Sequence, residues 1–172
     1  MRKPFLIPLL LIIACAIAGI YGVLHNQISY TVSPDYFHQF KFIQLNLAPA
    51  LQGRLGASLV GLISSWWMGI FISPFLLPIG FKRLSKQRYF ISMLQAFAIA
   101  ALTSLVASAI ALLLAFIFVT PDNVGEITIG DRQINNPAAF VRAGVMHNFG
   151  YLGGFLGVVM GREFLEKQLR QD

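Results

Sequence analysis

The chain has 172 residues, of which 56% are hydrophobic and only 12% are charged, and its mean hydropathy is +0.69. Soluble domains carry about 25% charged residues, so this composition argues against a soluble domain and predicts an integral membrane protein. The formal net charge of +6 arises from basic residues that flank apolar blocks. Such charges set membrane topology beside anionic lipid, and we expect no nucleic-acid partner.

The first apolar segment runs from about residue 5 to residue 24, long enough to cross a ~30 Å hydrocarbon layer as a helix. The stretch from Ile12 to Cys15 resembles a lipoprotein cleavage site, so a cleaved signal peptide is the rival interpretation. Because the apolar run continues past Cys15, we expect an uncleaved first span. Cys15 is also the only cysteine, which excludes an intramolecular disulfide.

Residues 25–54 form the first segment predicted outside the membrane. We expect the first helix to end at His25, residues 28–32 to be extended, and Ser33 to cap a helix that begins with Pro34. Over about residues 34–47, apolar side chains recur at helical spacing, which predicts an amphipathic helix on the membrane surface with its aromatic side towards lipid. This predicted face consists of Tyr36, Phe37, Phe40, Ile43 and Leu47.

The second predicted span covers about residues 55–79. Small residues recur every four positions along it, a pattern that favours close contact with another helix. These residues are Gly61, Ser65, Gly69 and Ser73. Trp66 and Trp67 lie near the middle, where we expect one indole to fill volume inside the bundle and the other to face lipid. Pro74 and Pro78 are expected to bend the second half.

A basic loop at residues 81–88 follows, with four positive and no negative charges, which the positive-inside rule places in the cytoplasm. The third span is predicted over about residues 90–119, long enough that it must tilt or protrude. Small residues again recur every four positions in this span. They are Ala96, Ala100, Ser104 and Ser108.

Residues 120–136 form a second outside loop, in which alternation around Gly130 predicts a short hairpin over about residues 126–134. Pro137 is expected to begin the last helix. Its membrane portion covers about residues 143–161, before a charged helical tail at 162–172. The glycines expected to pack against another helix are Gly150, Gly153, Gly154, Gly157 and Gly161.

These features predict an all-α fold. One domain, residues 1–172, forms a four-helix transmembrane bundle with both termini in the cytoplasm. The surface helix and the hairpin lie on the outer side. The expected partners are the lipid bilayer and, through the glycine stripes, a second copy of the chain or a partner membrane subunit. No cofactor is predicted.

The predicted topology brings two His-Asn pairs to similar depth near the outer side. His25 leaves the first helix there, and His147 lies about one turn inside the last span, on the same helix face as Tyr151. Unpaired polar groups in hydrocarbon cost several kcal/mol, so these groups need partners whatever their function. The candidate ligand-binding cluster comprises His25, Asn26, Asp35, Tyr36, His38, His147, Asn148 and Tyr151.

The cluster is open to several interpretations. It either holds the helices together or binds a small ligand or ion, and no catalytic residue is predicted. The weak candidates for metal ligands are His25, His38 and His147, but no HxxxH, HExxH or CxxC spacing supports a metal site. A histidine in a membrane could also pass protons in a transporter. Ser29 and Ser33 lack a nucleophile elbow, so hydrolase chemistry is not favoured.

Four short stretches stand out when taken together. They are residues 25–29 (His-Asn-Gln-Ile-Ser), 33–37 (Ser-Pro-Asp-Tyr-Phe), 64–69 (Ser-Ser-Trp-Trp-Met-Gly) and 147–154 (His-Asn-Phe-Gly-Tyr-Leu-Gly-Gly). In combination they resemble a family of small bacterial integral membrane proteins to which no activity is assigned. That family often carries an aspartate where this chain has Asn26, a departure that removes a carboxylate from the cluster. The resemblance implies a bacterial four-helix membrane protein.

We therefore expect a multi-pass, non-enzymatic protein of the bacterial inner membrane, with an outer-side polar cluster that is structural or binds a small ligand or ion. A small oligomeric transporter or channel is the alternative, because four helices seldom enclose a pathway alone. An intramembrane metal-dependent enzyme is the second alternative.

Overall fold

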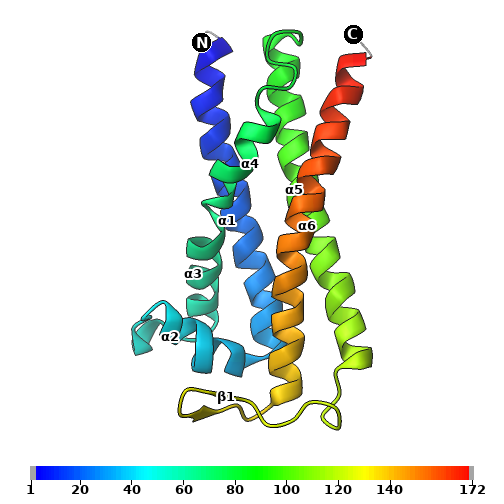
Figure 1. Cartoon of the computed structure of the whole chain (residues 1–172). Helices are drawn as coiled ribbons and strands as arrows, with labels where there is room; N and C mark the ends of the chain where they lie inside the picture. The colour runs from blue at the N-terminus through cyan, green and yellow to red at the C-terminus, as the bar shows by residue number, and fades with distance from the viewer. Residues whose placement is uncertain (1–2, 171–172) are drawn as a thin grey trace.

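The computed structural model describes residues 3–170, which form a bundle of long helices (Figure 1). A short 3₁₀ turn, Lys3–Phe5, leads into α1 (Leu6–Val32), and α3 (Arg54–Ser65) and α4 (Met68–Leu76) together form the next long segment. α5 (Lys86–Phe118) and α6 (Pro137–Arg170) complete the bundle. The predicted all-α fold is confirmed, while residues 171 and 172 of the predicted tail lie outside the described residues.

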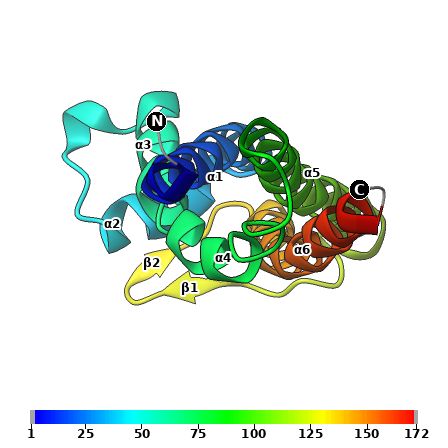
Figure 2. The ribbon, with the colours of Figure 1, turned by 90° about the horizontal axis from the view of Figure 1, so that it is seen from above.

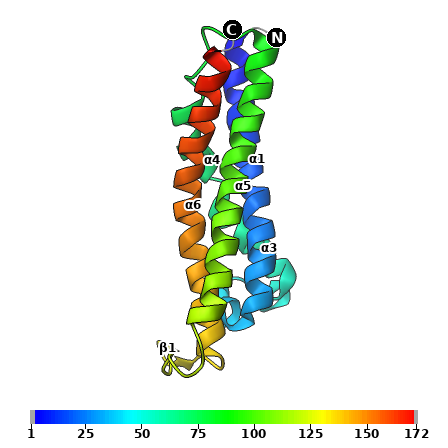
Figure 3. The same ribbon diagram turned by 90° about the vertical axis from the view of Figure 1, so that its right-hand side faces the viewer.

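Three helical segments of the described chain are long and apolar enough to cross a membrane: Lys3–Val32, Arg54–Leu76 and Lys86–Phe118. α6 is as long as α5 but less apolar, and it lies beside α5 along the length of the bundle (Figure 3). Seen from above, α4 lies beside α6, and α1 lies between α3 and α5 (Figure 2). It contacts all four of these helices.

The two ends of the bundle differ in charge. The end that carries both termini and the α4–α5 loop, here called the basic end, has eight basic and two acidic side chains among the described residues. The opposite end carries the α1–α3 connection and a hairpin of β1 (Thr128–Ile129) and β2 (Arg132–Gln133). This hairpin end has four basic and four acidic side chains.

α1 does not end at His25, as predicted from the sequence, but continues through Val32. The polar side chains that suggested a loop have partners on neighbouring helices, and Asn26 Nδ2 donates a hydrogen bond to the Ala57 carbonyl of α3. The helix ends at Ser33, whose backbone is extended because the residue before a proline avoids the helical region. Ser33 Oγ accepts a hydrogen bond from the backbone N–H of Tyr36, so Ser33 does cap the following helix.

The predicted surface helix is a π-helical segment, Tyr36–Lys41, followed by α2 (Phe42–Gln44). Its aromatic side was predicted to face lipid, and this prediction is wrong for the residues that form the core of the face. Tyr36 and Phe37 of this face are buried within the protein, and so is Phe42, which was not predicted to belong to it. The π segment explains the change: the N–H of Phe42 bonds to the Phe37 carbonyl five residues earlier, which brings Phe42 inward and leaves Ile43 exposed.

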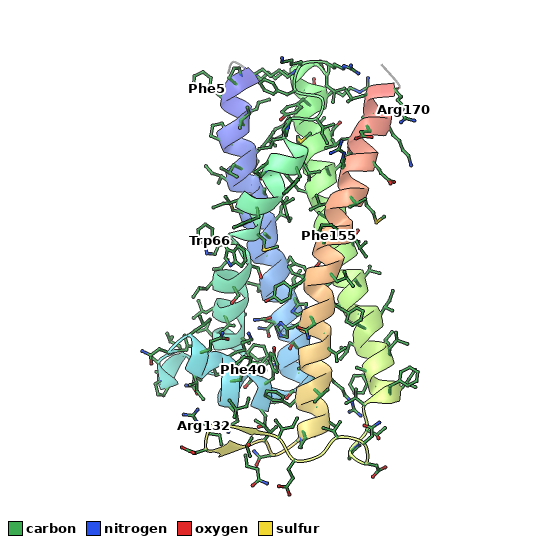
Figure 4. The ribbon with its side chains drawn as sticks, viewed as in Figure 1. Phe5, Phe40, Trp66, Arg132, Phe155 and Arg170 are labelled. Carbon is green, nitrogen blue, oxygen red and sulfur yellow. The ribbon has the colours of Figure 1, made fainter. Side chains whose placement is uncertain are left out.

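The second predicted span is broken between α3 and α4, at Trp66 and Trp67. Both indoles are exposed, 46% and 37%, so the expectation that one fills the bundle is wrong. Figure 4 shows Trp66 projecting from this break. The tryptophans point away because the small residues beside them take the contact face: Gly61 packs on the backbone of α1 at Gly22, and Gly69 packs on it at Cys15. α4 contains Pro74 and already ends at Leu76.

The small-residue stripes meet within the same chain. On α5 the buried stripe residues face the glycines of α6, with Ala96 beside Gly161 and Ala100 beside Gly157. Farther towards the hairpin end, Ser104 and Ser108 lie beside Gly153 and Gly150, and Ser104 Oγ donates to the Gly150 carbonyl. A Cβ on most of these glycines would press on a neighbouring backbone, so the helices approach as closely as glycine allows.

Candidate functional site

The two histidines that the sequence placed at similar depth are in contact. The rings of His25 on α1 and His147 on α6 meet edge to face, with centroids 4.5 Å apart. His147 is held on two further sides: its Nε2 lies 2.9 Å from Ser29 Oγ, and the Tyr36 ring stacks on it at 4.9 Å. Three elements, α1, α6 and the π-helical segment, therefore position this imidazole.

His25 is less well provided with partners than His147. Its side chain is 3% exposed, and Nδ1 lies 3.4 Å from Asn26 Oδ1. Its Nε2 is buried and has no hydrogen-bond partner among the described residues. The Met146 carbonyl is near this ring but lacks the geometry of a hydrogen bond. A buried polar atom without a hydrogen-bond partner lowers the stability of a fold by about 1–3 kcal/mol, so the burial of this nitrogen is unfavourable unless something else binds it.

A cavity of about 90 Å³ lies beside the histidine pair, and we call it the histidine cavity. It holds room for several water molecules. The space exists because the residues of α1, α3, α4, α5 and α6 that face it are mostly small. Its polar lining includes hydroxyl and imidazole groups. The polar side chains that line it are Tyr21, His25, Asn26, Lys41, Ser64, Ser65, Ser104, His147 and Tyr151.

The charge of the histidine cavity is one-sided. Lys41 is the only lysine or arginine among its described lining residues, and these include no carboxylate. The Lys41 ammonium lies 4.6 Å from the Phe40 ring centroid and donates to Gln44 Oε1 at 3.2 Å. Burial lowers the pKa of Lys41 and raises the pKa of Tyr36 to about 12, so the Tyr36 hydroxyl stays protonated at neutral pH. The cavity thus suits a neutral or anionic guest.

The remaining predicted site residues lie around this core or apart from it. Tyr151 lines the cavity with its side chain 58% exposed, whereas Asn148 is exposed on another face of α6 and does not line the cavity. Asp35 Oδ2 accepts hydrogen bonds from the backbone N–H groups of Asn135 and Asn136, which ties the π-helical segment to the loop before α6. His38 Nε2 lies 3.0 Å from the Tyr30 hydroxyl.

Several groups of the site were missed in the sequence. Tyr21 and Ser29 lie four residues before and after His25, so they share its face on a continuous helix. Ser29 was not predicted to join the site because α1 was expected to end at His25. In an extended segment Ser29 would not lie on the same face as His25. Ser65 and Ser104 were identified only as small packing residues, and Lys41 was not among the predicted site residues.

The histidines do not form a three-residue metal cluster. Within residues 3–170 no group of three or more histidine, cysteine, aspartate or glutamate side chains converges at a distance suited to one metal ion. His25 and His147 supply two imidazoles, while His38 is bonded to Tyr30. Two imidazoles are fewer than the three protein ligands that catalytic zinc sites use.

Comparisons of the chain with models of known protein families, with curated proteins and with solved structures find no match. The resemblance noted from the four short stretches therefore stays a prediction.

Proposed function

We propose that this chain is a four-span protein of the bacterial inner membrane that binds a small molecule in the histidine cavity without catalysing a reaction on it. The molecule is neutral or anionic and carries hydrogen-bonding groups. α6 would be the fourth span, and both termini would lie in the cytoplasm.

The charge distribution supports this topology. The basic end carries a large excess of positive charge, and the hairpin end is balanced. Under the positive-inside rule the basic end belongs in the cytoplasm. α6 lies along α5 with its glycines against Ala96 and Ala100. Since α5 is long and apolar enough to cross the membrane, α6 would cross with it.

The observation that carries the proposal is the unpartnered Nε2 of His25 beside an open cavity. The large majority of buried polar atoms have a hydrogen-bond partner, so a group in the cavity has to supply one for this nitrogen. A guest with a donor or acceptor group would give this nitrogen a partner. Tyr21, Ser65 and Ser104 are placed to bind other polar atoms of the guest. Because the described lining residues include no carboxylate, a cation is disfavoured.

The test is to identify what the purified protein retains. Denaturing the wild type should release close to one equivalent of a small molecule detectable by mass spectrometry. His25→Leu and Gly154→Leu should lose it, because the first removes the unpartnered nitrogen and the second fills the cavity. The matched control is Phe155→Leu on the next residue of α6, whose side chain is 70% exposed. Release of nothing but lipid and detergent, or equal release from all four proteins, would contradict the proposal.

A transporter or channel is the second candidate, and the break in the α3–α4 segment favours it. Discontinuous membrane helices commonly line the substrate sites of transporters. Here Ser64, Ser65, Met68 and Gly69, on both sides of the break, line the histidine cavity. No comparable observation favours the metal-dependent enzyme.

Transport would make ion or solute flux from reconstituted liposomes depend on His147, because this residue lines the cavity and orders three elements around it. We expect His147→Ala to reduce that flux severalfold, while Asn148→Ala, on the exposed face of the same helix, leaves it unchanged. Wild-type flux equal to that of empty liposomes across several ions would exclude this candidate.

A further inference from the structure

A second cavity lies at the basic end, away from the histidine cavity. Its volume is about 630 Å³, within the ~300–1,000 Å³ typical of ligand sites. It is bounded by Ile7 of α1, Pro74 of α4, the α4–α5 loop from residue 77 to 83, and Leu169 in the last turn of α6. Three segments that are distant in the sequence, at residue 7, residues 74–83 and residue 169, thus form its walls.

The loop that forms one wall is held in place by specific hydrogen bonds. The Tyr89 hydroxyl, fully buried, donates to the Leu77 carbonyl at 2.6 Å. Lys3 Nζ donates to the Leu84 carbonyl at 2.6 Å and lies over the rings of Phe81 and Tyr89. The shape of the cavity is therefore fixed by the fold, because hydrogen bonds anchor the chain on both sides of Lys82 and Arg83.

The chemistry of this cavity is divided between its wall and its rim. The wall is apolar, with Ile7, Pro78, Phe81 and Leu169 among its residues. The rim carries the exposed side chains of Lys82 and Arg83, for which the structure gives no hydrogen bond or ion pair among the described residues. Within residues 3–170 no carboxylate lines the cavity. An occupant should therefore combine an anionic group with an apolar body.

We propose that this cavity binds an anionic phospholipid, with its phosphate on Lys82 and Arg83 and the start of its acyl chains on the apolar wall. The planar guanidinium of Arg83 can hold two phosphate oxygens at once, and Lys82 adds a second positive charge. Both lie at the end of the bundle where the interface with lipid headgroups is expected. Free phosphate would use the rim and leave the apolar wall exposed, so the wall favours a lipid. The proposal is independent of any guest in the histidine cavity.

Native mass spectrometry of the full chain in detergent tests this proposal. The protein is mixed with phosphatidylglycerol or with phosphatidylcholine, and bound lipid is counted. We expect one phosphatidylglycerol to bind in preference to phosphatidylcholine. The variant Lys82→Gln/Arg83→Gln should lower the affinity for phosphatidylglycerol at least about tenfold. Because both residues are exposed, the variant should keep its fold, which its melting temperature in detergent would verify.

The matched control removes the same amount of charge from the same end. Lys86→Gln/Lys167→Gln alters two exposed residues that do not line the cavity, and it should leave the preferred lipid bound. An equal loss in both double variants would mean general attraction of anionic lipid to a basic surface and would overturn the site. Displacement of the lipid by millimolar inorganic phosphate would overturn the lipid assignment and indicate a site for soluble phosphate.

Discussion

Gly157→Ala is expected to lower the free energy of unfolding by about 2 kcal/mol, measured by denaturant titration in detergent micelles. The added methyl would approach the Ala100 carbonyl oxygen at 2.6 Å and its Cα at 2.7 Å. These are backbone atoms of α5, so no side chain can rotate to make room. α5 and α6 must move apart, which weakens the neighbouring contacts of Ala96 with Gly161 and Ser104 with Gly153.

The same substitution three residues away provides the control. A Cβ on Gly154 would meet only Ser104 Oγ at 3.9 Å, an ordinary contact. Gly154→Ala should therefore stay within about 0.5 kcal/mol of the wild type. If the α6 stripe instead faced a second chain, Gly157→Ala would reduce the oligomeric fraction and leave the stability of the monomer unchanged. Equal stability of the two alanine variants would contradict the close packing of α6 on α5 at Gly157.

The contact faces of the helices could be predicted because small residues at four-residue spacing serve one physical purpose in a membrane helix. The hydrophobic effect does not drive helices together in lipid, because lipid tails are as apolar as the side chains. Helices therefore associate where their backbones can approach closely. Gly157, Ala100 and Gly61 were assigned to such faces from spacing alone. The spacing does not predict which stripe packs against which, because all of the stripes consist of similar small residues. The structure pairs α5 with α6 and α1 with the α3–α4 segment.

The errors in the predicted site have a common cause. The end of α1 was predicted from the polarity of neighbouring residues, whereas hydrogen-bond partners distant in the sequence determine where the helix ends. His25, Asn26 and Gln27 resemble the start of a loop, but Asn26 bonds to α3, and Gln27 Nε2 bonds to the Arg54 carbonyl at its start. Pro34 was the dependable local signal, because its ring restricts the residue before it whatever the tertiary contacts. The topology predicted from the sequence placed His25 and His147 at similar depth but did not predict their contact, and the place of Ser29 required the correct end of α1.

The aromatic residues of the π-helical segment illustrate a second limit. Apolar spacing predicts that a face is buried but does not distinguish lipid from protein as its partner. A period of 3.6 residues selected Ile43, while the wider turn of the π segment places Phe42 inside. The stacking of Tyr36 on His147 then follows from this wider turn and from the anchoring of the segment by Asp35.

Ser29→Ala is expected to lower the free energy of unfolding by about 1–2 kcal/mol, because it leaves His147 Nε2 without the hydroxyl 2.9 Å away. The change removes one oxygen from a fully buried residue and adds no bulk. Ser33→Ala is a poor control, since Ser33 caps a helix. Ser73→Ala is better suited, because Ser73 is also buried and its hydroxyl donates within its own helix, to the Gly69 carbonyl. It should have a smaller effect in the same detergent titration.

His25→Leu should behave in the opposite way, and the comparison with Ser29→Ala separates a packing role from a binding role. Leucine removes the unpartnered Nε2 at similar volume, so we expect His25→Leu to be neutral or stabilising by up to about 1 kcal/mol. If the leucine variant is at least as stable as the wild type, His25 is not needed for stability. Its Nε2 would then be retained to contact a bound guest. A loss as large as that of Ser29→Ala would show instead that His25 holds α1 to α6, and the histidine cavity would then be a gap left by packing.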